Sequence, residues 1–123
     1  PAFCTSMGRC FLAFFPPHIF KEYWEKIKPE PFTSYTITDK YILMEELEKI
    51  RNRGFAVSNQ EMNLGWQSIA VPIFRGANVS AAFGVSYNID VLNDGETIQS
   101  IVEALLDISK KSSIMSEIRT REI

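Results

Sequence analysis

The stretch Ser68–Tyr87, SIAVPIFRGANVSAAFGVSY, decides the fold. Its two runs rich in β-branched and aromatic residues, Ser68–Phe74 and Val79–Tyr87, flank a turn at Gly76–Asn78, which predicts a β-hairpin. Because proline cannot donate a hydrogen bond to a strand ladder, Pro72 predicts either an edge position or a bulge in the first strand.

The second strand of this hairpin alternates in side-chain size, since successive residues point to opposite faces of a sheet. One face carries the larger side chains Val79, Ala81, Phe83, Val85 and Tyr87. The other carries Ser80, Ala82, Gly84 and Ser86. This small face leaves room beside the sheet, for a ligand or for a closely packed helix. Taken alone, the pattern favours packing.

Helical spacing of apolar residues predicts four helices around these strands. They cover Thr5–Phe15 (capped by Thr5 or Ser6), Pro17–Lys28, Lys40–Arg53 (between the caps Asp39 and Gly54) and a segment that Asn93 or Asp94 caps. The tail from Ser109 to Ile123 continues this last helix or frays. Thr33–Thr38 predicts a strand or an extended link, and Phe55–Ser58 a strand. The order predicts an α+β fold, an antiparallel sheet with helices on its faces. Because three or four strands make a thin sheet, further strands are expected upstream of Pro1.

Composition bounds the classes of function. The chain has 123 residues, enough for one domain, and is 46% hydrophobic, which argues against disorder. Its apolar runs are too short to span a bilayer. The net charge of -2 argues against a nucleic-acid surface on this chain. Two cysteines and one histidine predict neither a disulfide framework nor a zinc site, so no metal or cofactor is expected.

Candidates for catalysis are few. His18, the only imidazole, follows two prolines at a helix start and is interpreted as a turn residue. Cys10 lies among apolar helix residues and is interpreted as core. Cys4 lies near a helix N-terminus, where a thiolate is favoured, but it has no basic neighbour in sequence.

Candidates for binding are stronger. The segment Thr5–Gly8 opens a helix, and the free N–H groups there favour a carboxylate, although the hydroxyls could equally serve only as caps. Trp66 and Ser68 share one face of the neighbouring strand. Trp66 could stack on a planar ring or belong to the core.

An ordered series of segments resembles the effector-binding domain of IclR-type bacterial transcriptional regulators. The segments are Pro1–Leu12 (PAFCTSMGRCFL), Thr36–Asp39 (TITD), Glu46–Val57 (ELEKIRNRGFAV), Glu61, Gly65, Ser68–Phe74 (SIAVPIF) and Val79–Ser86 (VSAAFGVS). The opening PAFCTSMGR is similar to one branch, the regulators of aromatic-acid and β-ketoadipate catabolism.

The resemblance implies a GAF-like fold and no enzymatic activity. It implies that residues 1–123 are an N-terminally incomplete effector-binding domain of a cytoplasmic protein. A winged helix-turn-helix domain would lie upstream and would make the DNA contacts. It also implies a homodimer or tetramer and a small acid effector such as 4-hydroxybenzoate, protocatechuate or β-ketoadipate.

The ligand pocket of the family falls on ten residues here. These are Ser6, Met7, Gly8, Leu12, Ser58, Glu61, Trp66, Ser68, Gly84 and Ser86. Three positions depart from the family pattern. Ser58 stands where some relatives carry an acidic residue, Gln67 where the aromatic-acid branch often has arginine, and Trp66 where an aliphatic residue is common.

Two other hypotheses remain open beside the sensor. The chain could be a small α+β enzyme acting on a carboxylic acid through Cys4 or Glu61. It could also be a pure dimerisation module whose pocket is filled by Trp66 and Met7. With no lysine or arginine mapped into the pocket, a ring with one carboxylate is favoured over a dicarboxylate.

Overall fold

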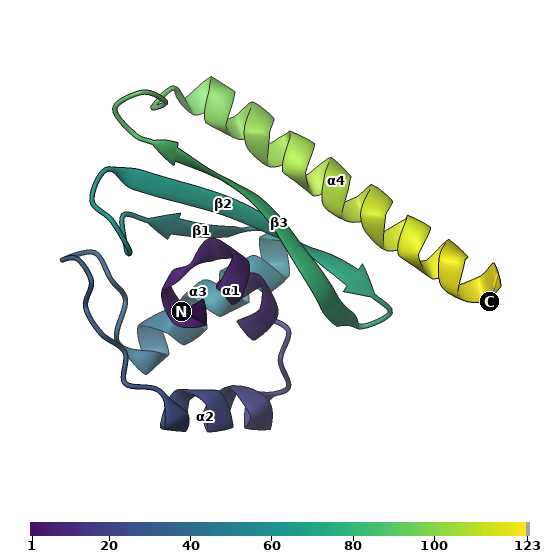
Figure 1. Cartoon of the computed structure of the whole chain (residues 1–123), viewed down its shortest axis with the longest axis horizontal. Helices are drawn as coiled ribbons and strands as arrows, with labels where there is room; N and C mark the ends of the chain where they lie inside the picture. The colour runs from purple at the N-terminus through teal and green to yellow at the C-terminus, as the bar shows by residue number, and fades with distance from the viewer. Residues whose placement is uncertain (123) are drawn as a thin grey trace.

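Three antiparallel strands form one sheet in the order β1–β2–β3. The computed structural model describes residues 1–122, with the side chains of residues 1–113. The elements are η1 (Ala2–Cys4), α1 (Ser6–Leu12), α2 (Pro17–Lys26), α3 (Lys40–Arg53), β1 (Ala56–Asn59), β2 (Trp66–Arg75), β3 (Asn78–Asn88) and α4 (Gly95–Glu122). Figure 1 shows α1, α2 and α3 gathered on one side of the sheet and α4 on the other. The predicted α+β class and the β2–β3 hairpin are confirmed.

Pro72 lies in β2, the central strand of the sheet, so the prediction that this strand lies at an edge is wrong. Beyond Ala70, however, β1 has ended and β2 pairs with β3 alone. The hydroxyl of Ser109 in α4 donates to the Pro72 carbonyl (2.5 Å), and Ser113 Oγ accepts from the Phe74 N–H (3.0 Å). The ladder also shifts register between Ile73 and Phe74, which agrees with the predicted bulge. Proline is therefore tolerated because β1 no longer needs its missing N–H there, and hydroxyl groups of α4 bond to backbone groups of Pro72 and Phe74 that β1 does not reach.

The two faces of the sheet have different cores. On one face Ala56 and Ala70 pack against buried side chains of η1, α1, α2 and α3. On the other face Ile69, Val71 and Tyr87 pack against α4. Ala82 joins the first cluster, so packing does account for part of the small-residue face, as the pattern favoured.

Several predicted boundaries are corrected. Thr5 does cap α1, but the helix ends at Leu12 instead of Phe15, and α2 ends at Lys26 instead of Lys28. Thr33–Thr38 forms no strand; it is an irregular link. The α3 prediction is confirmed at both ends, with Asp39 as N-cap and Gly54 in the left-handed conformation (φ 87°).

The last helix begins after Asp94, whose carboxylate accepts from the Thr97 N–H (3.1 Å). The helix continues through Glu122, while the side chains from residue 114 onward and residue 123 itself lie outside the described part. Among the described residues, no helix is long and apolar enough to cross a membrane.

Candidate functional site

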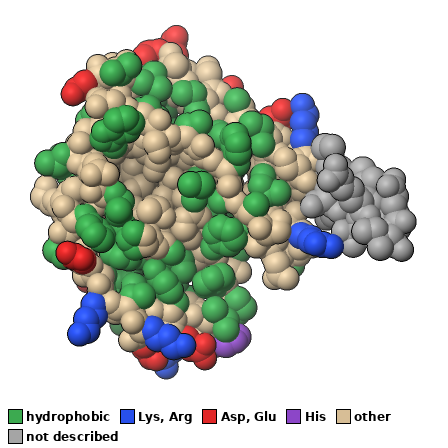
Figure 2. Space-filling view, viewed as in Figure 1, with side chains coloured by type: hydrophobic (Ala, Val, Ile, Leu, Met, Phe, Trp, Pro, Cys, Tyr) green, Lys and Arg blue, Asp and Glu red, His purple; other side chains and the backbone are tan. Residues whose placement is uncertain are grey.

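A pocket of about 330 Å³ opens between the start of α1, the β1–β2 loop and the adjoining ends of β2 and β3. Its lining consists of Cys4, Thr5, Ser6, Met7, Ser58, Glu61, Met62, Asn63, Trp66, Gln67, Ser68 and Ser86. The floor is buried and includes Ser6, Ser58 and Glu61, whereas Met7 and Trp66 are about half exposed at the rim. Figure 2 shows a hollow in this face with hydrophobic side chains around it.

Seven of the ten residues expected at a ligand site line this pocket. They are Ser6, Met7, Ser58, Glu61, Trp66, Ser68 and Ser86. The structure thus brings together residues that lie far apart in the sequence, from α1 to β3.

The other three residues do not line it, and each has a packing reason. A Cβ on Gly8 would lie 2.3 Å from Ala2 Cα, so this glycine allows η1 to pack against α1. A Cβ on Gly84 would lie 2.6 Å from the Ile69 carbonyl oxygen of the neighbouring strand. Leu12 is buried in the core between the helices. These residues shape the site from outside the pocket.

The start of α1 borders the pocket through Thr5, Ser6 and Met7. The Thr5 hydroxyl caps the helix by accepting from the Gly8 N–H (3.1 Å). The first N–H groups of an α-helix have no acceptor within the helix, and here those of Ser6 and Met7 precede the capped one. The capping interpretation of Thr5–Gly8 is confirmed for Thr5, and carboxylate binding there stays a prediction for residues that border the pocket.

A buried ion pair lies in the pocket wall. Arg9 contacts Glu61 through two bonds, Nη1 to Oε2 (2.6 Å) and Nη2 to Oε1 (2.5 Å). Arg9 also donates to the carbonyls of Phe3 (2.9 Å) and Val57 (3.0 Å). Glu61 Oε1 accepts a further bond from the Ile37 N–H (3.0 Å). Both carboxylate oxygens are therefore occupied by partners from the protein.

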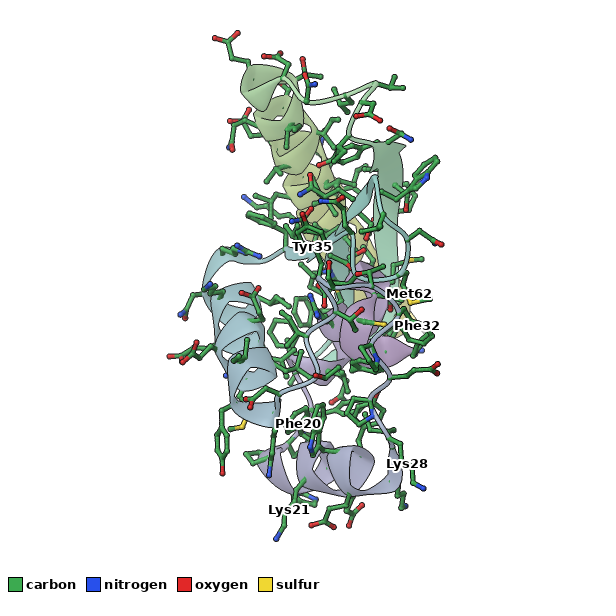
Figure 3. The ribbon with its side chains drawn as sticks, turned by 90° about the vertical axis from the view of Figure 1, so that its left-hand side faces the viewer. Phe20, Lys21, Lys28, Phe32, Tyr35 and Met62 are labelled. Atoms are coloured by element: carbon green, nitrogen blue, oxygen red, sulfur yellow. The ribbon has the colours of Figure 1, made fainter. Side chains whose placement is uncertain are left out.

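The β1–β2 loop is fixed by the irregular link between α2 and α3. The hydroxyls of Thr33 and Thr36 donate to the carbonyls of Gln60 and Glu61, each at 2.6 Å. Figure 3 shows Met62 of this loop on the same side of the molecule as Phe32 in the link. The segment predicted as a strand or an extended link is a link, and it holds one wall of the pocket.

Burial disfavours the thiolate form of both cysteines. Burial raises the pKa of Cys4, whose thiol donates to the Met62 thioether sulfur (3.2 Å). Burial raises the pKa of Cys10 to about 12, and this residue lies in the core as expected. The arrangement offers no activated nucleophile at Cys4 and no free carboxylate at Glu61, so it does not support the enzyme hypothesis.

Sequence reasoning missed Arg9 and the wall residues Met62 and Asn63. The signal for Arg9 was present, because an arginine between Gly8 and Cys10 interrupts an otherwise apolar helix. An arginine on such a face is buried only with a partner, and Glu61 is the partner. The loop residues carried no comparable signal.

Gln67, the departure from the arginine common in the aromatic-acid branch, also borders the pocket. Its side-chain oxygen accepts from the Tyr87 hydroxyl, which belongs to the face that α4 covers. Because an amide is uncharged, Gln67 does not supply the cation that an arginine would bring to the pocket.

A helix-covered antiparallel sheet with a small polar-floored pocket is an arrangement that can hold a small molecule. Residues 1–114 match the family described as "Bacterial transcriptional regulator IclR C-terminal", and the chain belongs to this family.

Curated relatives agree with this membership. The chain is 35% identical over 111 residues to the Pca regulon regulatory protein of Pseudomonas putida, covering 89% of this chain and 38% of the relative. It is 33% identical over 82 residues to the p-hydroxybenzoate hydroxylase transcriptional activator of Acinetobacter baylyi, covering 67% and 30%. The chain therefore spans less than half the length of these regulators.

Solved structures agree on the fold. The IclR protein of Thermotoga maritima superposes with a TM-score of 0.86 at 32% identity, over 94% of this chain and 47% of that one. The inducer-binding domain of PobR from Acinetobacter, a double mutant in complex with 3-hydroxybenzoic acid, gives a TM-score of 0.84 at 26% identity. That match covers 92% of this chain and 65% of that domain.

Proposed function

We propose that this chain is the effector-binding part of a transcriptional regulator and that its effector is a small aromatic carboxylic acid. The observation that carries this proposal is the pocket beside the start of α1. Its volume of about 330 Å³ suits a small molecule such as a single-ring acid.

The chemistry of the lining favours one carboxylate and a ring. The N–H groups of Ser6 and Met7 would receive the acid, with Trp66 at the rim as a flat surface for the ring. The hydroxyls of Ser68 and Ser86 would meet a phenol. Because the carboxylate of Glu61 is already occupied by Arg9, it is a poor partner for that phenol.

A dicarboxylate such as β-ketoadipate fits less well. Among the described residues that line the pocket there is no lysine, arginine or histidine. A second carboxylate would lose its hydration without gaining a cation, which is costly. We therefore expect 4-hydroxybenzoate and protocatechuate to bind more tightly than β-ketoadipate.

The relatives support the same class of effector. One is named as an activator of p-hydroxybenzoate hydroxylase transcription, and the PobR domain was solved with 3-hydroxybenzoic acid. Others, such as KdgR of Escherichia coli, carry no aromatic compound in their names. The preference for a ring therefore depends on the pocket of this chain, above all on Trp66.

In the proposed regulator, DNA binding belongs to a separate winged helix-turn-helix domain, and the effector acts on a dimer or tetramer. The effector shifts the population of domain arrangements by binding one of them more tightly. The chain itself performs no reaction. The net charge of -2 is consistent with a part that does not contact DNA.

Calorimetric titration of the chain with 4-hydroxybenzoate, protocatechuate and β-ketoadipate tests this proposal. We expect saturable binding of an aromatic acid, with a matching rise in the melting temperature and no loss of ligand mass. Tightest binding by β-ketoadipate would overturn the ring preference. Turnover of the acid would favour the enzyme.

A pure dimerisation module would show no stabilisation by any of the three acids. In that hypothesis Trp66 and Met7 fill the pocket, but both side chains are about half exposed at its rim. The open pocket thus favours the sensor.

A further inference from the structure

The wall of the pocket carries an unusual charge for a site that receives an acid. Glu61 is the only carboxylate among the described lining residues, which include no cationic side chain. Its side chain is 4% exposed, so water screens its charge weakly. An unpaired carboxylate in this position would repel an anionic ligand in the same cavity.

Arg9 lies directly behind this carboxylate. It is 1% exposed, does not line the pocket and meets both oxygens of Glu61 in a two-bond geometry. Its remaining bonds to the carbonyls of Phe3 and Val57 hold the guanidinium in place. The pair therefore brings no net charge to the pocket wall.

We propose that Arg9 is a specificity-determining residue of the pocket: by neutralising Glu61 from behind, it removes the repulsion by which an unpaired Glu61 would make the pocket reject an anion in favour of the neutral form of the same molecule. This inference rests on the proposed function, since it concerns the ligand of the same pocket. Arg9 acts through Glu61 and is thus a positioning residue.

A purely structural role for the pair makes a different prediction. The bonds of Arg9 join η1, α1, β1 and the β1–β2 loop, so breaking them would loosen the pocket. A looser pocket would bind an acid and its neutral isostere worse by the same factor. Charge selectivity, by contrast, changes the ratio of the two affinities, and its direction depends on which partner is removed.

The test measures this ratio with 4-hydroxybenzoate and 4-hydroxybenzamide, which share the ring and the phenol and differ in charge. Four proteins are titrated: the unaltered chain, Arg9→Met, Glu61→Gln and the double variant. With the remaining Arg9 or Glu61 charged, their pocket walls carry net charges of zero, minus one, plus one and zero. Circular dichroism and thermal unfolding establish that each variant is folded.

We expect Arg9→Met to lower the preference for the acid about tenfold and Glu61→Gln to raise it about tenfold. The double variant should return the preference to within about threefold of the unaltered chain, because replacing both partners of a buried pair leaves no uncompensated charge. If Arg9→Met does not fold, the rise in acid preference of Glu61→Gln alone tests the inference. That variant keeps Arg9 and the shape of the residue 61 side chain.

Equal losses for acid and amide in both single variants would overturn the inference and leave the proposed function intact. Failure of the unaltered chain to bind 4-hydroxybenzoate would instead refute the aromatic-acid proposal, and this inference with it.

Discussion

The two faces of the β-sheet are built from alternate residues of the same strands, yet they differ in kind. The face under α4 buries Ile69, Val71 and Tyr87 against apolar helix residues. The face under α1 holds all of the described buried polar and charged residues. These are Ser6, Arg9, Ser58 and Glu61.

The difference comes from side-chain size and from what covers each face. The large side chains under α4 fill the space between sheet and helix. Under α1, the serines of β2 and β3 are small, and the helix has only seven residues, so it covers part of the face and leaves the pocket at its start. The pocket thus lies on one face of the sheet, while apolar packing against α4 fills the other.

The largest expected effect is a loss of stability from a substitution on the polar face. Arg9→Met leaves Glu61 buried without a cation, and removing one partner of a buried pair costs about 3–5 kcal/mol of stability. Denaturant unfolding followed by tryptophan fluorescence measures this loss. The double variant with Glu61→Gln should recover most of it, and a double variant as unstable as the single one would contradict this account.

A substitution on the apolar face should separate stability from binding. Leu105→Ala removes a side chain of α4 that is 3% exposed and packs against the sheet, which costs about 2–5 kcal/mol. We expect the melting temperature to fall while the affinity for 4-hydroxybenzoate, measured well below that temperature, stays unchanged. A parallel loss of affinity would show that the two faces are not independent.

The sequence predicted the regular, apolar elements better than the polar contacts between them. Hydrophobic periodicity predicted α3 with its correct ends and located the β2–β3 hairpin, because burial of apolar side chains imposes a regular pattern. The position of Pro72 was harder, since its tolerance depends on hydroxyl groups of α4 that lie far along the chain.

At the polar face, residue type predicted candidates but not their partners. The resemblance pointed to Glu61 as a ligand contact, whereas its oxygens are held by Arg9 and Ile37. Thr33–Thr38 has the composition of a strand, but two of its hydroxyls bond to the β1–β2 loop. Such contacts join segments that are 24 to 52 residues apart, and no local pattern encodes them.

Trp66→Ala should weaken binding without changing stability, because the indole is 49% exposed at the rim. We expect a loss of about 1–3 kcal/mol in the binding of 4-hydroxybenzoate, by analogy with stacking of planar rings on aromatic side chains. Tyr41→Ala is the matched control, since Tyr41 is an exposed aromatic residue of α3 that does not line the pocket. Calorimetry of both variants measures the loss of affinity for 4-hydroxybenzoate. Equal losses would show that Trp66 does not contact the ligand.

The smallest expected effect compares two helix caps, one at the pocket and one away from it. Thr5→Ala removes the hydroxyl that accepts from the Gly8 N–H, and Asp39→Ala removes the carboxylate that accepts from the Tyr41 and Ile42 N–H groups. Each loss should cost about 1 kcal/mol of stability. Only Thr5→Ala should also weaken binding of the acid, because the uncapped Gly8 N–H and a frayed first turn would disturb the N–H groups of Ser6 and Met7. Titration of both variants with 4-hydroxybenzoate at matched temperature separates the two roles. If Asp39→Ala weakened binding as much as Thr5→Ala, global stability and not the start of α1 would control affinity, and the acid would have to be placed elsewhere in the pocket.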